Sequence, residues 1–172
     1  MIEIGAATAD TAGFAAAVGP ALLAMTRLAA RLAPHADPDD IVQEAVVRAW
    51  TKWDLFDAGR GTATAWLLAI TADQARAARR KRVRWLRVVD DRSAAPERAA
   101  AVRDLERDLD LERALHMLAE RQRLAVDCHY FVGLTVDETA IVMGCSPGTV
   151  KSTLHDARRR LRDLLGDGDD LD

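Results

Sequence analysis

The chain has 172 residues, of which 49% are hydrophobic and only 5% aromatic. This apolar content is sufficient for packed cores and excludes a wholly disordered chain, while the length permits one domain or two small ones. Alanine, leucine, arginine, aspartate and glutamate dominate, and the strict apolar–polar alternation of strands is missing. The predicted fold class is therefore all-α.

The formal net charge of −3 conceals two separate basic runs. Seven basic residues and no acidic one lie between Arg76 and Arg87, and a second run holds Lys151, Arg158, Arg159, Arg160 and Arg162. Acidic residues collect elsewhere, between Asp104 and Glu112 and in the C-terminal tail. Two cationic surfaces on an acidic protein predict two contacts with a polyanion, and two solvated helix faces are the alternative.

The cysteines and the N-terminal segment bear on the cellular compartment. Cys128 and Cys145 lie far apart, which predicts no disulfide framework and favours a reducing cytoplasm. The acidic N-terminus does not resemble a signal peptide. The longest uncharged apolar stretch, Thr11 to Thr26, contains Gly19 and Pro20 and is expected to fall short of a membrane span of about 20 residues.

Three helices are predicted in the first half of the chain. Helical spacing of apolar residues extends from Thr11 to Leu32, through Phe14, Val18, Leu22, Met25 and Leu28. A second helix begins with Asp37 as N-cap and Pro38 at its first position, and runs to about Trp53. Ile41, Val42, Ala45, Val46, Ala49 and Trp50 form its expected inward face. The glycine-containing loop from Asp57 to Thr64 precedes a third helix that starts at about Ala65 and enters the basic run.

Periodicity weakens after Leu86 and breaks at Ser93 to Pro96, which predicts a linker. The expected organisation is an N-terminal domain over residues 1–86, a flexible linker over 87–108, a C-terminal domain over 109–165 and an acidic tail over 166–172.

Three short helices are predicted in the C-terminal domain. The first covers Arg121 to Phe131 and ends at Gly133. The second begins with a capping box formed by Thr135 and Glu138, buries Ala140, Ile141 and Met143, and stops at Gly144. The last starts at Ser146-Pro147. Two short helices joined by a tight glycine-containing turn predict a helix-turn-helix.

The last helix carries one apolar stripe, formed by Val150, Leu154, Ala157, Leu161, Leu164 and Leu165. Gly148, Ser152, His155 and Arg159 lie opposite, with Lys151 and Arg158 on the flank. Small and polar residues near the helix start suit contact with base edges, and the arginines further along suit phosphates.

Two segments resemble the extracytoplasmic-function sigma factors of bacterial RNA polymerase, within the sigma-70 family. The first is DPDDIVQEAVVRAWTKWDLFD, followed by TAWLLAITADQARAARRKR. The second is LAERQRLAVDCHYFVGLTVDETAIVMGCSPGTVKSTLHDARRRLRDLL. The resemblance implies an alternative sigma factor that binds core RNA polymerase and directs promoter recognition and transcription initiation.

The resemblance also assigns residues to three surfaces. Core polymerase would be bound by Asp40, Gln43, Glu44 and Arg48. The downstream promoter element, with a flipped base in the loop, would be contacted by Asp57, Arg60, Gly61, Thr62, Thr64, Asp73, Arg76, Arg79 and Arg80. The upstream element would be read by Ser146, Gly148, Thr149, Lys151, Ser152, His155, Arg158 and Arg159. Trp66, Trp53 and Phe56 are expected in the core rather than as stacking platforms.

The family resemblance implies core polymerase, promoter DNA and an anti-sigma factor as partners, and no membrane insertion. No nucleophile–base pair, phosphate loop or paired-carboxylate site is apparent in the sequence, so no catalysis by this chain, no cofactor and no metal are expected. Two positions depart from the family pattern. Asp73 stands where asparagine is usual near the base pocket, and Asp156 where a basic residue is common on the recognition helix.

Two other functions remain open from the sequence. A DNA-binding regulator that acts without polymerase would use the last helix but would leave the Asp37 to Trp50 block without a role. A metal- or thiol-based sensor or enzyme would use Cys128, His129, Cys145 and His155. Adjacent helical residues such as Cys128 and His129 diverge and are poorly spaced for a metal, so buried apolar cysteines are the preferred interpretation.

Overall fold

The computed structural model describes residues 10–89 and 104–166, and these residues form helices and connecting turns without a strand. The predicted all-α class is confirmed. The first half contains α1 (Thr11–Leu32), α2 (Pro38–Trp50), the 3-10 turns η1 (Trp53–Leu55) and η2 (Ala58–Arg60), and α3 (Ala63–Val89). The second half contains α4 (Asp104–His116), α5 (Glu120–Val126), η3 (Asp127–Phe131), α6 (Val136–Met143) and α7 (Pro147–Leu165).

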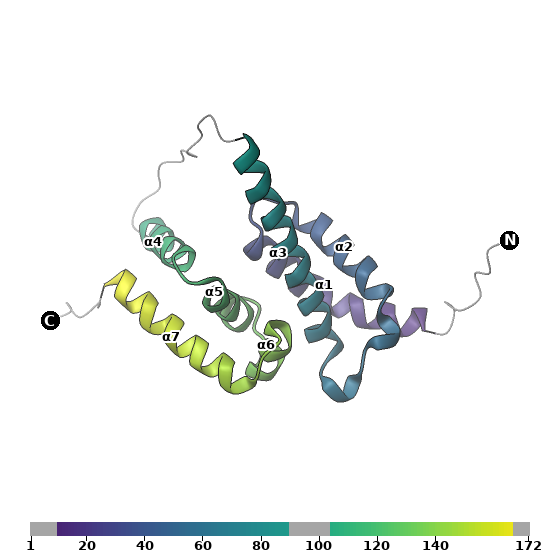
Figure 1. Cartoon of the computed structure of the whole chain (residues 1–172). Helices are drawn as coiled ribbons and strands as arrows, with labels where there is room; N and C mark the ends of the chain where they lie inside the picture. Colours follow the sequence, from purple (N-terminus) through teal and green to yellow (C-terminus); the bar gives the residue numbers. More distant parts are fainter. Residues whose placement is uncertain (1–9, 90–103, 167–172) are drawn as a thin grey trace.

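The first half is a bundle in which α1, α2 and α3 all contact one another (Figure 1). Met25 and Leu28 from α1 are fully buried, as are Leu67 and Leu68 from α3. Leu22, expected inside, is 43% exposed, and its neighbour Ala21 is buried instead. The smaller alanine permits a close approach of the packed helices.

The predicted helix over Thr11 to Leu32 is present, and α1 continues through Gly19 and Pro20. Proline removes only one backbone donor, and both residues are exposed, so water can reach the freed carbonyl. The continuous helix is long and apolar enough to cross a membrane, with a mean hydropathy of 1.4 over its best window. A core helix meets the same criterion, and α1 packs its buried residues against α2 and α3.

The start of α2 follows from its first four residues. Asp37 is the N-cap, with its side chain 2.9 Å from the Asp39 backbone N–H that donates to it, and Pro38 occupies the first turn. Ile41, Val42 and Ala45 are buried on one face. The helix ends at Trp50 rather than near Trp53, since Trp53 lies in the separate turn η1.

Helix also extends into the segment that was predicted as a linker. α3 continues to Val89, and α4 begins at Asp104, so the helical ends overlap residues 87–108 on both sides. Leucine, glutamate and arginine at these ends are good helix formers, so helix can persist where the apolar spacing weakens. The predicted break at Ser93 to Pro96 lies outside the described residues, as does the acidic tail beyond Gly166.

The second half packs α5, α6 and α4 around α7. Leu115 from α4, Val126 from α5 and Val142 from α6 are buried together with Val150 and Leu154 from α7. The predicted helix over Arg121 to Phe131 is present in two parts, because its last five residues form the π-helical turn η3. Such turns are rare and leave backbone groups displaced from the regular helical ladder.

The caps of α6 and α7 explain their bounds. Thr135 and Glu138 form the predicted capping box, and Gly144 ends α6 in the left-handed conformation at φ +60°. Ser146 caps α7 by accepting a hydrogen bond from the Thr149 N–H at 3.2 Å. Ile141, expected in the core of the second half, is only half-buried there.

The two halves contact each other. α3 lies against α6, and the C-terminal end of α1 meets η3 (Figure 1). This packing places Ile141 against the loop before α3, which explains why it is not fully buried within the core.

Candidate functional site

One face of α2 presents the four residues that the sequence assigned to polymerase. Asp40, Gln43, Glu44 and Arg48 are all exposed, whereas the opposite face is buried. Their spacing of three, one and four residues brings them to adjacent turns of the helix. Asp40 lies in the first turn, where a carboxylate also interacts favourably with the helix dipole.

Two apolar residues of α2 also reach the surface. Val47 is 62% exposed and lies one turn beyond Gln43, on the same face. Sequence analysis missed Val47, although its i+4 spacing from Gln43 was available as a signal. Trp50, predicted to point inward, is 37% exposed and contacts the Phe14 ring edge-on at 5.1 Å. A single exposed valine is ordinary on a protein surface, so only its place on the same face as Gln43 connects Val47 with this candidate interface.

The loop before α3 is held in shape by its own hydrogen bonds. The Asp57 side chain accepts a hydrogen bond from the Gly59 N–H at 2.8 Å, and the Thr62 hydroxyl accepts one from the Ala65 N–H at 3.1 Å. Gly61 has φ +151°, a conformation that side chains rarely adopt. Arg60 and Thr62 are exposed, while Thr64 is half-buried.

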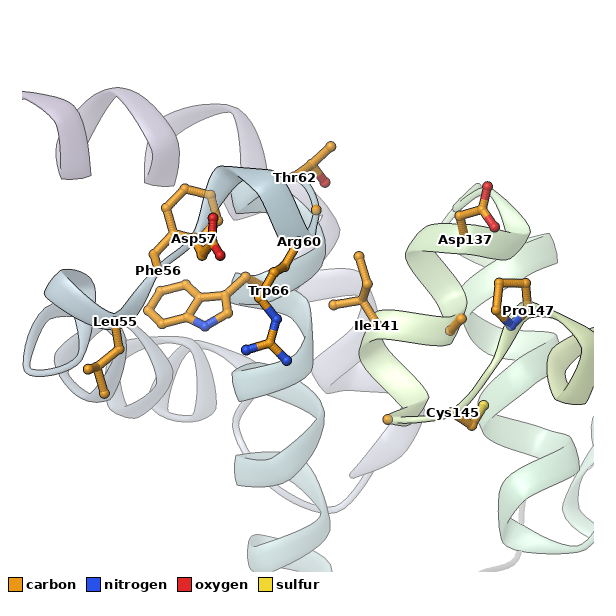
Figure 2. A pocket seen from close by; sticks show the side chains of 13 residues that line it. Leu55, Phe56, Asp57, Arg60, Thr62, Trp66, Asp137, Ile141, Cys145 and Pro147 are labelled. Atoms are coloured by element: carbon orange, nitrogen blue, oxygen red, sulfur yellow. The ribbon is translucent and has the colours of Figure 1, made fainter.

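Aromatic residues support this loop from behind. Trp53 and Phe56 stack with ring centroids 5.0 Å apart, and Trp66 lies 5.6 Å from Phe56. All three rings are half-buried. Phe56 and Trp66 also line a cleft of about 590 Å³ between the loop and the second half (Figure 2). Their placement therefore combines packing with access to this cleft.

The C-terminal part of α3 carries the first basic surface. Its exposed cationic residues are Arg79, Arg80, Lys81, Arg82 and Arg84. Arg76 is half-buried and pairs with the exposed Asp73 at 2.7 Å, three residues earlier on the helix. Asp73 thus pairs with the predicted DNA-contacting arginine that lies earliest on α3.

The exposed face of α7 carries the second basic surface. Gly148, Thr149, Lys151, Ser152, His155, Arg158 and Arg159 are all exposed, as is the cap Ser146. The Ser152 hydroxyl donates to the Thr149 carbonyl at 3.0 Å. Asp156 lies 3.4 Å from Arg159. The two departures from the family pattern, Asp73 and Asp156, therefore each pair with an arginine three residues later.

The cysteines and histidines do not form a common site among the described residues. Cys128 and Cys145 are free, and no group of three potential metal ligands is found in the described part of the chain. Burial raises the pKa of the Cys128 thiol to about 12, so this thiol is a weak nucleophile at neutral pH. His129 contacts the Leu134 carbonyl through Nδ1 at 2.8 Å.

Both halves of the chain match models of known protein families. Residues 21–84 match the model of sigma-70 region 2, and residues 108–161 match the model of sigma-70 region 4. The chain belongs to the sigma-70 family. The region 2 match contains α2, the loop and most of α3, and the region 4 match contains α5, α6 and most of α7.

Named relatives place this sigma factor in the extracytoplasmic-function group. An RNA polymerase sigma-E factor of Streptomyces avermitilis is 36% identical over 157 residues, which cover 87% of this chain and 82% of the relative. The ECF RNA polymerase sigma factor SigL of Mycobacterium tuberculosis is 32% identical over 164 residues, 92% of each chain.

Two solved structures share this fold. One is the sigma factor RpoE of Bartonella quintana in complex with the anti-sigma factor NepR, with a TM-score of 0.67 and 32% identity over 89% of this chain and 96% of that chain. The other is CnrH in complex with the cytosolic domain of CnrY, with a TM-score of 0.65 and 26% identity over 92% and 91% of the two chains.

Proposed function

We propose that this chain is an alternative sigma factor that binds core RNA polymerase and directs it to promoters. The observation that carries the proposal is the presence, in one chain, of an exposed polar face on α2, a structured loop followed by a basic helix, and a capped helix with an exposed basic face. A regulator that acts on DNA alone requires only the last of these. The relatives with matching regions are RNA polymerase sigma factors.

We assign polymerase binding to Asp40, Gln43, Glu44 and Arg48, with Val47 as an apolar addition. These side chains are exposed, and none of Gln43, Glu44 and Arg48 caps the helix. Polar residues around one exposed apolar side chain are a common arrangement at protein interfaces. This assignment gives the exposed face of α2 a function, whereas a regulator that acts without polymerase has no use for that face.

We assign the downstream element to the loop and to α3. The φ of Gly61 leaves backbone exposed without a side chain, so a nucleotide can approach closely. A base extruded from the duplex can be accommodated beside such a backbone, with Thr62 and Thr64 as hydrogen-bonding groups. Arg79 and Arg80 lie further along α3, where their charges can bind the phosphates that follow.

We assign the upstream element to α6 and α7, acting as a helix-turn-helix. The N-terminal turns of α7 present Gly148, Lys151 and Ser152 to solvent, which is the end that enters a major groove in this motif. His155 lies one turn further along α7. Arg158 and Arg159 follow in the next turn, and we assign them to phosphate contacts. In this proposal the chain itself performs no catalysis and uses no cofactor, and the polymerase supplies the chemistry.

We further propose an anti-sigma factor as a partner, since the two similar structures are of sigma factors with NepR and with the cytosolic domain of CnrY. Because a sigma factor acts on the polymerase and the chromosome, we propose a cytoplasmic location without membrane insertion. The domain map remains a proposal, with domains over 1–86 and 109–165. Limited proteolysis should first cleave between residues 87 and 108, and first cleavage within α2 contradicts the map.

The function is tested by transcription in vitro with purified core RNA polymerase, with and without the chain. Promoter-dependent initiation that requires both components supports the proposal. A chain that binds duplex DNA specifically but leaves the core enzyme inactive is instead a polymerase-independent regulator. A library of genomic fragments as template avoids the need to know the promoter sequence.

A further inference from the structure

The contact between the two halves contains a buried ion pair. The Arg31 Nε, at the end of α1, donates a hydrogen bond to Asp127 Oδ1 of η3 at 2.5 Å. Asp127 is fully buried, and the Arg31 side chain is 20% exposed. These two residues are 96 positions apart in the sequence, so the pair exists only while the halves are packed together.

The surroundings of Arg31 all belong to the second half. Its Nη1 donates to Glu112 at 3.2 Å, and its guanidinium carbon lies 3.5 Å from the centre of the Phe131 ring. In return, Arg123 donates to the backbone carbonyl of Arg31 at 3.0 Å. The described contacts of the Arg31 side chain therefore hold the halves together and do not stabilise the first half by itself.

The contact with Arg31 favours the negatively charged form of the buried Asp127 side chain. Burial raises the pKa of Asp127, and the hydrogen bond from Arg31 opposes that rise. Arg123, the other cation nearby, has its Nε 3.7 Å from Asp127 Oδ2, beyond hydrogen-bond distance. A buried carboxylate that loses its main partner is strongly destabilised, whereas separation of α1 from η3 lets water reach it. Loss of Arg31 thus favours the separated arrangement.

The same packing covers part of the loop before α3. The Thr62 hydroxyl donates to Glu138 of α6 at 3.2 Å. The Ile141 side chain lies directly over Gly61, so that a β-carbon there would be 2.3 Å from Ile141 Cδ1. Figure 2 shows Ile141 of α6 between the loop and the rest of the second half. The exposed face of α7, which carries Lys151 and Ser152, is not covered by this packing.

We propose that Arg31 and Asp127 form a latch that holds α6 over Gly61 and Thr62, and that the latch opens before this loop takes up DNA. The claim that α6 masks the loop rests on the proposed function of the loop, whereas the claim that Arg31 and Asp127 hold the halves together does not. Glu138 adds to the masking, because its carboxylate occupies the Thr62 hydroxyl and repels phosphates. The closed chain covers Gly61 and engages the Thr62 hydroxyl, while Arg60 of the same loop and the upstream-element face stay accessible.

The latch is tested with Arg31→Ala in the full-length chain, by distance measurement between spin labels. Exposed Lys52 and Arg160 are replaced by cysteine for labelling, with Cys145→Ser, and buried Cys128 remains unlabelled because of its pKa of about 12. Arg27→Ala is the matched control, since Arg27 is exposed on the same helix and makes none of these contacts. Circular dichroism verifies that both variants are folded.

The latch predicts a longer distance population in Arg31→Ala than in the parent or in Arg27→Ala. The ratio of open to closed chains should rise about ten-fold or more, as for a lost hydrogen bond to a charged group. Asp127→Asn should shift the ratio in the same direction. Identical distance distributions in Arg31→Ala and Arg27→Ala overturn the latch. The measurement contains neither DNA nor polymerase, so its result is independent of the proposed function.

Masking is tested with a short single-stranded oligonucleotide of random sequence, by fluorescence anisotropy. Arg31→Ala should bind this strand more tightly, by about the factor by which its open fraction rises, and should bind a duplex of random sequence as the parent does. If Arg31→Ala opens the chain but leaves single-strand affinity unchanged, the masking claim is wrong and the latch stands. Equal gains for both nucleic acids also contradict masking.

Discussion

Ile141 of α6 packs against Gly61 so closely that a β-carbon at position 61 would require the Ile141 Cδ1 methyl to move. Gly61 also has φ +151°, which disfavours any other residue. One glycine therefore satisfies two requirements, the path of the loop and the approach of the second half.

Gly61→Ala should separate the halves as well as strain the loop. The strain should cost about 1–3 kcal/mol of unfolding free energy, and displacement of the Ile141 side chain should weaken the packing of α6 on the loop and raise the open fraction. The double variant Gly61→Ala with Ile141→Ala keeps the strain and removes the clash. Denaturant unfolding measures the first effect and spin-label distances the second.

Gly133→Ala is the matched control for this experiment. Gly133 has φ +84° but nothing within 4 Å of an added β-carbon, so it produces strain without a clash. It should lower stability and leave the distance between the halves unchanged. A closed arrangement in Gly61→Ala that matches the parent contradicts the prediction.

Gln43→Ala combined with Glu44→Ala should weaken binding to core polymerase while preserving α2. Alanine is the better helix former, so circular dichroism should show undiminished helicity. Only the minority of interface residues that carry most of the binding energy cost about 1 kcal/mol or more each when truncated, and assigning both residues to that minority predicts a loss of affinity of about ten-fold or more. Asp54→Ala, at an exposed acid outside α2, is the control. Unchanged affinity in a titration with core enzyme removes both residues from the interface.

Lys151 and Arg159 should differ in how they recognise the upstream element. Lys151, in the early turns of α7, can donate to guanine, so Lys151→Ala should cost about 1–3 kcal/mol at one base pair. Arg159→Ala should weaken binding to all sequences alike and reduce the salt dependence by about one unit. A base-by-base scan with each mutant holoenzyme separates the two outcomes. Uniform loss with Lys151→Ala identifies a phosphate contact instead.

Asp156→Asn should increase affinity for duplex DNA without changing sequence preference. Arg159 lies 3.4 Å from Asp156, and both side chains are largely solvent-accessible, so the pair is weak. Its loss frees Arg159 and removes a negative charge near phosphates, which predicts a gain of a few-fold at most. Asp163→Asn is the control for net charge, because Asp163 is exposed on the same helix. Equal gains from the two variants indicate a charge effect without release of Arg159.

The capping box of α6 should lose its contribution in acid. The backbone N–H of Thr135 donates to Glu138, and this bond lowers the pKa of that carboxyl. For an acid with a lowered pKa in the folded chain, the stabilisation is complete above its ordinary pKa and is lost as pH falls through the folded-state value.

Glu138→Gln should therefore flatten the acid limb of the stability profile and cost only about 0.3–1 kcal/mol at neutral pH, because glutamine can keep the capping hydrogen bond and loses only the charge. Unfolding free energy as a function of pH, for the parent and Glu138→Gln, provides the measurement. Asp137→Asn is the control, since it leaves the capping box intact. If Glu138→Gln loses stability in acid as steeply as the parent does, groups other than Glu138 cause that loss.

Much of the helical framework was predictable because its signals are local. Asp37, Thr135 and Ser146 cap helices through hydrogen bonds to residues two or three positions away, and Gly144 ends α6. The exposed faces of α2 and α7 also followed from the spacing of their apolar residues. Such features depend on contacts within one or two turns, and periodicity records them directly.

Other features were decided by packing between distant segments. The spacing of apolar residues on α1 does not show that Ala21 is buried and Leu22 is exposed, because that difference depends on how closely the neighbouring helices approach. Ile141 has the pattern of a core residue and instead contacts Gly61, 80 positions earlier. The π-helical turn at η3 has no apolar periodicity of its own that distinguishes it from a continuation of α5.

The sequence by itself determined the all-α class, the helix caps and the family to which the chain belongs. The pairing of Arg31 with Asp127 and the covering of Gly61 by α6 were decided only by the tertiary structure. An arginine near the end of one helix and an aspartate inside another have many equivalent partners along the chain. Only the packing of the two halves removes Asp127 from water, and that desolvation makes Arg31 its required partner.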